Sequence, residues 1–590
     1  MNLSRPSALL VALITGATIA PPLPAFDGGA ELRRFQDETR RRIEADRMAS
    51  NAVADVPATA PGAIRTAGEV QTTIAGFEVH GVTRFTNDEV AAVLDDFVGR
   101  PLGTVDLHAA ADALMRHYRS AGYLLAKVYV PPQAFTEIVR LDVEEGRLET
   151  GGIELVDQAD RVDEGAVTSL LDRYLYTDRP LKRRDLERAL LLVDDLPGVR
   201  AGSILYPGTE VGTARLRVLA SDEPTLAGNV DLDNFGYRPL GRERLGTTLY
   251  LNSPGGVGDQ VVARLVTSGG SSNYAYVMYL RPVGRSGARM GGSVDHFSYD
   301  GEALFDGGDI DGEARDARLF VTYPLVRSRH SNLALRTDWS HYRIIDRSHA
   351  STAPTPSLPV PSVRAERRLR VLQFSLSGDD NHDALPNGTT LFDVNLVTGD
   401  LDIAGDAGYA RADAFGANTR GRFSRASYRL QRLQHLSGPW SIYASLYGQF
   451  ASRNLDASQR FYLGGATSQP GYPIGETSGD SGMETHFELR RDLSLPSGDS
   501  LQIGALYSHG EVEHFKSPWQ PVDNTTTLGS VGLQLTYTSK HRWLIRGLIG
   551  RQTGGRSPIE QFINLNSDGK DEDYRMWFQA IRYFELGGSR

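Results

Sequence analysis

The sequence contains no cysteine, which excludes disulfide bonds and thiolate metal sites. Beyond the N-terminal region there is no run of about 18 apolar residues, so we predict no membrane-spanning helix. Strands that alternate apolar and polar residues escape that test, and a membrane barrel remains possible. The formal net charge is −10 at pH 7 and no basic run occurs. We therefore predict no nucleic-acid partner.

The N-terminus carries a short apolar run over residues 8–20, preceded by Arg5. This run is too short to cross a bilayer and long enough for the core of a signal peptide. A small residue, Ala25, offers a cleavage point. The sequence therefore predicts a signal peptide over residues 1–25 and export from the cytoplasm.

Residues 26–50 contain good helix formers without Gly or Pro from Glu31 to Met48, which predicts a helix. Its apolar stripe is thin and consists of Leu32, Phe35 and Ile43. A helix that is polar on its other faces does not suit a dry core. Residues 51–71 form an Ala-, Pro- and Gly-containing linker, long enough for this helix to reach back into a pore. The alternative interpretation is a solvated N-terminal arm.

Two consecutive units share the order strand, helix, helix, strand, strand. The first covers residues 72–149, and Thr86 with Glu89 three residues later predicts a capping box at its first helix. Its best-patterned strand alternates apolar and other residues at Ala126, Val128 and Val130, and ends at Pro131-Pro132. The second unit covers residues 150–224, with helices near 164–174 and 182–196.

Residues 225–590 lack helix signals and consist of segments in which apolar and polar residues alternate. One example runs from Ser530 to Thr538, with apolar residues at every second position. Short Gly- or Pro-containing turns alternate with long connections, which is typical of outer-membrane barrels and not of soluble sandwiches. We predict about sixteen antiparallel transmembrane strands, an even number as in bacterial barrels. Phe584 ends the last apolar/aromatic segment, and residues 585–590 follow it.

A glycine-rich segment from Phe461 to Gly482 is expected between the eleventh and twelfth strands. It resembles the lumen-folded loop of the two-partner secretion transporters, outer-membrane pores that export haemolysins and filamentous adhesins. That loop opens with Leu-Gly-Gly, continues with Val-Arg-Gly-Tyr or -Phe, and closes with Gly-Asp-x-Gly. The matching residues are Leu463, Gly464, Gly465, Ser468, Gly471, Tyr472, Gly475, Gly479, Asp480 and Gly482. Gln469 and Pro470 stand where the family has Val-Arg.

The resemblance extends to the two preceding units, which are similar to POTRA domains. The stretch from Tyr118 to Tyr123, followed by residues 126–133, resembles the first POTRA domain of the secretion transporters. Two such units are typical of a secretion transporter and not of the general barrel-assembly factor. The resemblance also implies that the N-terminal helix plugs the barrel.

In the family, the loop arginine reaches an aspartate in a Phe-x-Asp-x-Gly pattern on the barrel wall. The matching wall stretch here is residues 506–510, so Ser508 replaces the aspartate while Pro470 replaces the arginine. We expect the loop to lie against Ser508 without a charged pair. It would be held by the rigidity of Pro470 and Pro473 and by Tyr472 packed on the wall.

No motif in the chain predicts catalysis, a metal or another cofactor. Gly479–Gly482 copies the nucleophile sequence of trypsin-like proteases, but no protease domain precedes it, and a loop turn is the better interpretation. The histidines show no zinc-ligand spacing.

We therefore interpret the chain as an outer-membrane transporter with periplasmic POTRA domains. Its expected partners are a secreted haemolysin- or adhesin-type exoprotein, outer-membrane lipid and the barrel assembly machinery. An unfolded β-rich client would add as a strand to the edge at Ala126, Val128 and Val130. Two alternatives remain open: a barrel assembly factor of the same superfamily, and a passive porin with periplasmic binding modules.

Overall fold

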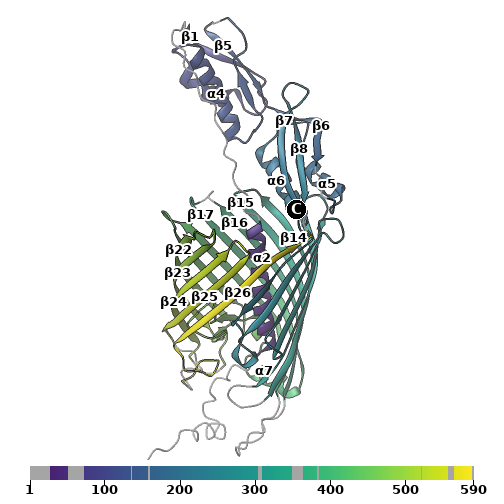
Figure 1. The fold of residues 1–590 in the computed structure, drawn as a ribbon, viewed down its shortest axis with the longest axis vertical. Coiled ribbons are helices and arrows are strands. Elements are labelled where there is room, and N and C mark those ends of the chain that lie inside the picture. Colours follow the sequence, from purple (N-terminus) through teal and green to yellow (C-terminus); the bar gives the residue numbers. More distant parts are fainter. Residues whose placement is uncertain are drawn as a thin grey trace, which may run out of the picture.

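The computed structural model describes residues 27–50, 72–134, 136–156, 160–302, 309–348, 363–381, 385–519, 521, 523–555 and 564–587, without the side chains of 45–50. The predicted signal peptide (1–25) and linker (51–71) lie outside these residues. Two small αβ units stack on one end of a closed barrel, and one helix lies within the barrel (Figure 1). None of the helices described is both long and apolar enough to cross a membrane.

The barrel has sixteen antiparallel strands, and its last strand pairs with its first. The strands are β9 (Leu226–Asp233), β10 (Arg244–Asn252), β11 (Gln260–Thr267), β12 (Ser272–Val283), β13 (Ala288–Glu302), β14 (Asp309–Arg327), β15 (Ser331–Ser348), β16 (Val363–Asn381), β17 (Gly388–Gly405), β18 (Gly421–His435), β19 (Trp440–Ala451), β22 (Ser481–Ser494), β23 (Ser500–Glu513), β24 (Thr525–Ser539), β25 (Trp543–Gly554) and β26 (Tyr574–Leu586). The predicted fold class is confirmed, and the glycine-rich loop joins the eleventh and twelfth strands.

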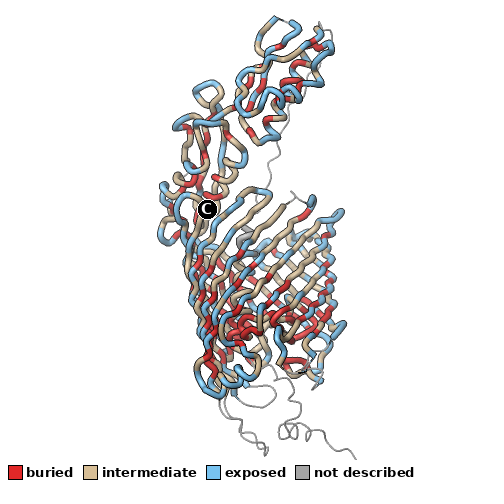
Figure 2. Tube along the Cα trace, turned by 180° about the vertical axis from the view of Figure 1, so that it is seen from behind, coloured by how far each residue is buried: buried red, intermediate tan, exposed pale blue. Residues whose placement is uncertain are grey.

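Alternation along the strands separates an apolar outer face from the lumen. In β23, Ile503 and Tyr507 are exposed on the outside, whereas Leu506 and Ser508 are buried inside. Buried residues gather in the half of the barrel away from the two αβ units (Figure 2). The lumen is therefore filled mainly in that half.

Several boundaries differ from the prediction, and residues 225–590, where we expected no helix, contain α7 (Ala407–Phe415) in the connection after β17. Strands β13 to β17 are 15 to 19 residues long, so they continue into the long loops expected at residues 300–313 and 343–367. The last strand continues beyond Phe584, because Glu585 and Leu586 pair with Ala227 and Leu226 of β9. Backbone pairing at the seam thus extends the strand past its apolar pattern.

The first αβ unit contains β1 (Thr72–Thr73), β2 (Gly76–His80), α3 (Asn87–Leu94), η1 (Asp95–Phe97), β3 (Pro101–Leu102), α4 (Thr104–Ser120), β4 (Lys127–Tyr129) and β5 (Ile138–Glu144). Its main sheet has the order β2-β5-β4. The capping box of Thr86 and Glu89 is present. Glu145 is buried at the end of the sheet, where it accepts a hydrogen bond of 2.9 Å from the Tyr118 hydroxyl. Burial and this carboxylate raise the pKa of Tyr118.

The second αβ unit contains β6 (Arg147–Val156), α5 (Glu164–Tyr174), α6 (Arg183–Asp194), β7 (Val199–Pro207) and β8 (Thr213–Asp222), with the sheet order β6-β8-β7. Its first strand begins at Arg147, before the predicted boundary at 150, because a turn at Gly146 (φ +68°) leads directly from β5 into β6.

The second unit holds the near end of the barrel through two short turns and the end of one strand. The Asp163 amide donates to the Gly256 carbonyl (2.8 Å), and Arg188 donates to the Leu325 carbonyl (3.0 Å). Tyr174 donates to the Ser286 carbonyl (3.1 Å). These contacts involve the turns β10–β11 and β12–β13 and the end of β14, so the unit is fixed over one side of the barrel mouth.

Candidate functional site

The lumen contains a loop and a helix, and together they form the candidate site. The loop runs from β19 to β22 and folds inward through η3 (Ala457–Gln459), β20 (Phe461–Leu463) and β21 (Thr477–Gly479), the two strands forming a small hairpin. Gly464, Gly465 and Gly475 have φ values of +113°, +97° and +64°. Because L side chains rarely adopt such values, these glycines allow the chain to reverse inside the barrel.

The loop tip lies against the last strands of the wall. The Trp577 indole N–H donates to the Pro470 carbonyl (2.8 Å), and a Cβ added at Gly550 would lie 2.5 Å from that same oxygen. The Gly471 amide donates to the Ser530 hydroxyl (3.2 Å). The Tyr472 ring is fully buried, and its hydroxyl donates to carbonyls at the end of β25. The tip is thus fixed by backbone groups and close packing.

Ser508 faces the loop, but the side chain that it meets is that of Gln469 rather than Pro470. The Ser508 hydroxyl donates to the Gln469 side-chain oxygen (3.1 Å), and the Gln469 amide donates to Glu484 (3.3 Å). The Pro470 carbonyl is instead engaged by Trp577 of β26. The contact between loop and wall at Ser508 is uncharged.

Asp480 stabilises the base of the loop. Its carboxylate accepts the Leu455 amide (3.0 Å) and the Lys516 amide (2.9 Å) and lies 3.2 Å from the Arg460 guanidinium. The neighbouring Ser481 hydroxyl accepts the Ala451 amide (3.3 Å). These are structural roles, and among the described residues no His, Asp and Glu side chains group as metal ligands.

The lumen helix is α2 (Gly28–Ser50), which begins three residues before the predicted Glu31. The earlier start has a local cause, because the Asp27 carboxylate accepts the Ala30 amide (2.9 Å) and caps the helix. Towards the middle of α2, Glu38 forms ion pairs of 3.1 Å with both Arg244 and Arg264. These two arginines also pair with wall aspartates on β9, so the helix completes a buried charge network.

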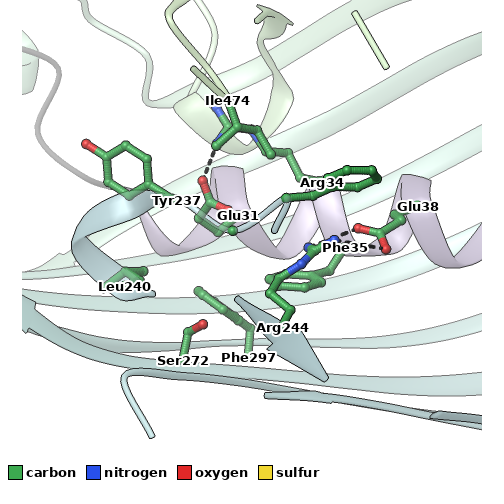
Figure 3. A pocket seen from close by; sticks show the side chains of 12 residues that line it. Glu31, Arg34, Phe35, Glu38, Tyr237, Leu240, Arg244, Ser272, Phe297 and Ile474 are labelled. Atoms are coloured by element: carbon green, nitrogen blue, oxygen red, sulfur yellow. Dashed lines mark hydrogen bonds and ion pairs between the residues drawn. The ribbon is translucent and has the colours of Figure 1, made fainter. Parts of the chain in front are cut away.

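The thin apolar stripe of α2 is buried. Phe35 stacks on Tyr274 with 4.9 Å between ring centroids and lies 5.3 Å from the Phe297 ring. Leu32 has no exposed surface. Figure 3 shows Phe35, Glu38 and Arg244 converging around a cavity of about 20 Å³, roughly the space of one water molecule. The contact between helix and wall is therefore polar around Glu38 and apolar around Leu32 and Phe35.

The helix and the loop also contact each other. Arg33 donates to the Arg460 carbonyl (2.9 Å), and the Arg34 guanidinium lies 4.5 Å from the Tyr462 ring centroid. Arg367 of β16 pairs with Asp27 at the helix start and with Asp456 in the loop. The two lumen elements therefore form one connected body.

Comparison with known proteins identifies the family. A model of the ShlB-type POTRA domain matches residues 72–146. The model of the haemolysin secretion/activation protein ShlB/FhaC/HecB family matches residues 212–533, more than half of the chain. The chain belongs to this family. It is an outer-membrane transporter of the two-partner secretion class, with its POTRA domains in the periplasm.

Individual relatives agree with this assignment. The transporter is 25% identical over 503 residues to the heme/hemopexin transporter protein HuxB of Haemophilus influenzae (strain 86-028NP), with 84% of each chain covered. It is 22% identical over 437 residues to the hemolysin transporter protein HpmB of Proteus mirabilis, with 72% of each covered. The solved structure of CdiB from Escherichia coli shares the fold, with a TM-score of 0.71, 19% identity, and coverage of 95% of this chain and 99% of that one.

In the transporter's first POTRA domain, β4 is an edge strand of the sheet. Beyond the end of β4, the side-chain amide of Gln133 donates to the Arg140 carbonyl (2.8 Å), and its side-chain oxygen accepts the Arg140 amide (2.8 Å). We infer that the backbone N–H and C=O groups of the even-numbered β5 residues point toward β4. Lys127 and Tyr129 lie opposite Glu144 and Asp142, so their backbone groups bond to β5. It follows that the N–H and C=O of Val128 point to the open edge. Ala126 and Val130 flank this strand.

Three contact residues of the transporter were not found from the sequence: Gln469, Gly550 and Trp577. Gly550 and Trp577 both lie on lumen-facing positions of the alternating strands, as the buried members of β25 and β26. In the sequence, a glycine and a tryptophan at lumen-facing positions of neighbouring strands indicate a place where another segment could pack against the wall. Their partner became evident only with the loop in place.

Proposed function

We propose that this transporter binds an unfolded β-rich exoprotein at its POTRA domains and passes it through the lumen to the cell surface. The proposal is supported by the position of α2, which fills the lumen and is held to the wall in part by ion pairs of Glu38. A helix held in this way to a polar wall is suited to leave it. Its exit would open a path lined in part by charged side chains such as Arg425 and Arg429.

Client capture is proposed at the open edge of β4. An extended chain adds to a sheet edge through main-chain hydrogen bonds, with little demand on its own sequence. Val128 supplies an outward donor and acceptor there, and the flanking residues Ala126 and Val130 extend the same segment. Proline at Val128 removes the outward donor and leaves the bonds of Lys127 and Tyr129 to β5 in place.

The test replaces Val128 by Pro and, as the matched control, by Ala. The control loses most of the side chain and keeps the N–H group. We expect Val128→Pro to lower export of the exoprotein client about tenfold, since one main-chain hydrogen bond and its geometry are worth about 1–1.5 kcal/mol. Val128→Ala should retain most export. Equal export by both variants, with normal barrel insertion, would remove β4 from the mechanism.

The two alternative functions give different results in the same cells. A barrel assembly factor would lower the amounts of other outer-membrane proteins when deleted, and a passive porin would change small-solute uptake without affecting any exoprotein. The paired seam of β9 with β26 closes the wall in this structure. That closure favours transport through the lumen over insertion through the wall.

A further inference from the structure

The N-terminal half of α2 rests on an apolar surface of the lumen wall. We define the apolar seat as Tyr274, Phe297, Tyr299 and Ile344, contributed by β12, β13 and β15. All four side chains are buried and belong to one cluster with Leu32 and Phe35 of the helix. Phe35 stacks on Tyr274 at an interplanar angle of 12°, and Figure 3 shows its ring beside Phe297.

Two helical glycines bring the helix backbone close to this surface. A Cβ added at Gly29 would lie 2.5 Å from Ile344 Cδ1, and one added at Gly28 would lie 2.8 Å from Tyr299 Cε1. Glycine lowers helix propensity, so its presence in the first turn has a cost that the close approach explains. The helix start is shaped to the seat.

The seat continues into a larger apolar area of the wall. Further members of the same cluster are Val266, Leu369, Val397, Leu401, Ile403 and Phe423. These residues are buried members of the alternating strands β11, β16, β17 and β18. Charged side chains border this area. The Tyr274 hydroxyl donates to Asp295 (2.7 Å), and the Tyr299 hydroxyl donates to Asp346 (2.6 Å). The lumen wall along the route from the periplasm to the surface thus carries an apolar surface with a charged border.

Departure of α2 would expose the seat to water inside the lumen, which is unfavourable for apolar surface. Residues three apart on a helix have Cβ atoms about 5–6 Å apart, and alternate residues of a strand lie about 6.6 Å apart. An extended chain therefore presents pairs of side chains at a spacing comparable to that of Leu32 and Phe35. Apolar contact is non-directional, so it suits a passing chain of varied sequence.

We propose that the apolar seat is a binding site for aliphatic and aromatic side chains of the polypeptide in transit. Leu32 and Phe35 occupy it in the resting transporter as an intramolecular substitute. This inference rests on the proposed function and adds the chemistry by which the lumen holds its client. It assigns the occupant as apolar side chains of an extended chain, because that is what the helix presents to the same surface.

The test uses the full chain with Leu32→Ser and Phe35→Ser, which weakens the seating of α2, in planar lipid bilayers. Two synthetic 20-residue Ser/Thr-rich peptides are added on the periplasmic side, one with three Phe residues and one with Ser at those positions. We expect blocks by the Phe peptide to last about tenfold longer, the effect of burying roughly one aromatic ring. Adding Tyr274→Ser should abolish the difference.

Tyr443→Ser is the matched control. Tyr443 is another lumen-facing tyrosine, whose hydroxyl accepts the Gln431 amide (2.8 Å), and it is not a member of the seat cluster. This variant should keep the tenfold difference between the peptides. Equal block by both peptides, or an equal loss in the Tyr274→Ser and Tyr443→Ser variants, overturns the proposal. Heat-modifiability in gels verifies that each variant is a folded barrel.

Exoprotein export is measured separately, so that failures are distinguishable. If the Phe peptide blocks longer but no exoprotein depends on this chain, the seat stands and the proposed function falls. If export depends on the chain and both peptides block equally, the proposed function stands and the seat falls.

Discussion

The helix α2 and the loop between β19 and β22 both fill the lumen, but they are held by different kinds of contact. In its middle, the helix is held by ion pairs from Glu38 to Arg244 and Arg264. The loop tip is held by hydrogen bonds between backbone and neutral side chains and by close packing, as at Pro470 and Trp577. The helix is attached by charge in its middle and by apolar packing in its N-terminal half, whereas the loop tip is attached by backbone hydrogen bonds and close packing.

This difference suits two roles. Ion pairs open without disturbing the fold of the wall, because each arginine keeps its aspartate on β9 when Glu38 leaves. The loop tip has no alternative partners of this kind, because the Pro470 carbonyl is bonded to Trp577 and packed against Gly550 in one position only. We interpret the loop as a permanent part of the lumen and the helix as the part that moves.

The strongest test of the loop side is Gly550→Ala. A Cβ at this position would lie 2.5 Å from the Pro470 carbonyl oxygen. Because this oxygen belongs to the loop backbone and the new Cβ is fixed to the strand, the loop must move. Overpacking of this kind costs about 1–3 kcal/mol, and loss of the Trp577 bond adds to it. We expect Gly550→Ala to lower the heat-modifiability temperature and to abolish most export.

Gly547→Ala in the same strand is the control. A Cβ at Gly547 meets no heavy atom within 4 Å, so this variant should behave as the unmodified chain. Equal behaviour of the two variants would contradict the placement of the loop tip.

The next effect in size concerns the helix. Glu38→Gln removes the charge that joins two arginines, and because the Glu38 side chain is 31% exposed, solvent screening reduces the expected loss to about 1–2 kcal/mol. We expect the open probability in bilayers to rise about tenfold. In the unmodified chain, raising the salt concentration should increase opening. Glu38→Gln should reduce that dependence, and the pairs Asp27–Arg367 and Arg42–Asp231 account for the part that remains.

Glu44→Gln is the matched control on the same helix, because Glu44 is exposed. It should leave both the open probability and its salt dependence nearly unchanged. If Glu38→Gln showed the open probability and the salt response of the unmodified chain, Glu38 would not be what holds the helix.

The sequence predicted the elements whose signals are local. Alternation gave the strand number and the place of the loop, and Thr86 with Glu89 gave a helix start. The stripe of Leu32 and Phe35 was also visible, but not the apolar seat, because its members come from three strands. The sequence also did not predict that Ser508 contacts Gln469 rather than Pro470. This contact joins residues far apart in the chain, and no local pattern indicates which loop residue meets Ser508.

The smallest expected effect concerns that last contact. The Ser508 hydroxyl donates to Gln469, and Glu484 accepts from the same Gln469 side chain. Ser508→Asp alone places a second carboxylate beside Glu484 at a fully buried position and should destabilise the barrel. Gln469→Arg alone retains Glu484 as an acceptor and should be milder. In the double variant the two new charges face each other, so we expect a favourable coupling of about 0.5–1 kcal/mol in a double-mutant cycle.

A second cycle, on Pro470→Arg and Ser508→Asp, sharpens the result. Pro470 contacts Trp577 and Gly550 rather than Ser508, so an arginine there should disturb the tip without relieving the new carboxylate. We therefore expect near-additive effects in this cycle and clear coupling in the first, both measured by heat-modifiability and export. Stronger coupling through position 470 than through position 469 would contradict this placement. It would indicate that the loop register differs by one residue and that Pro470, not Gln469, lies opposite Ser508.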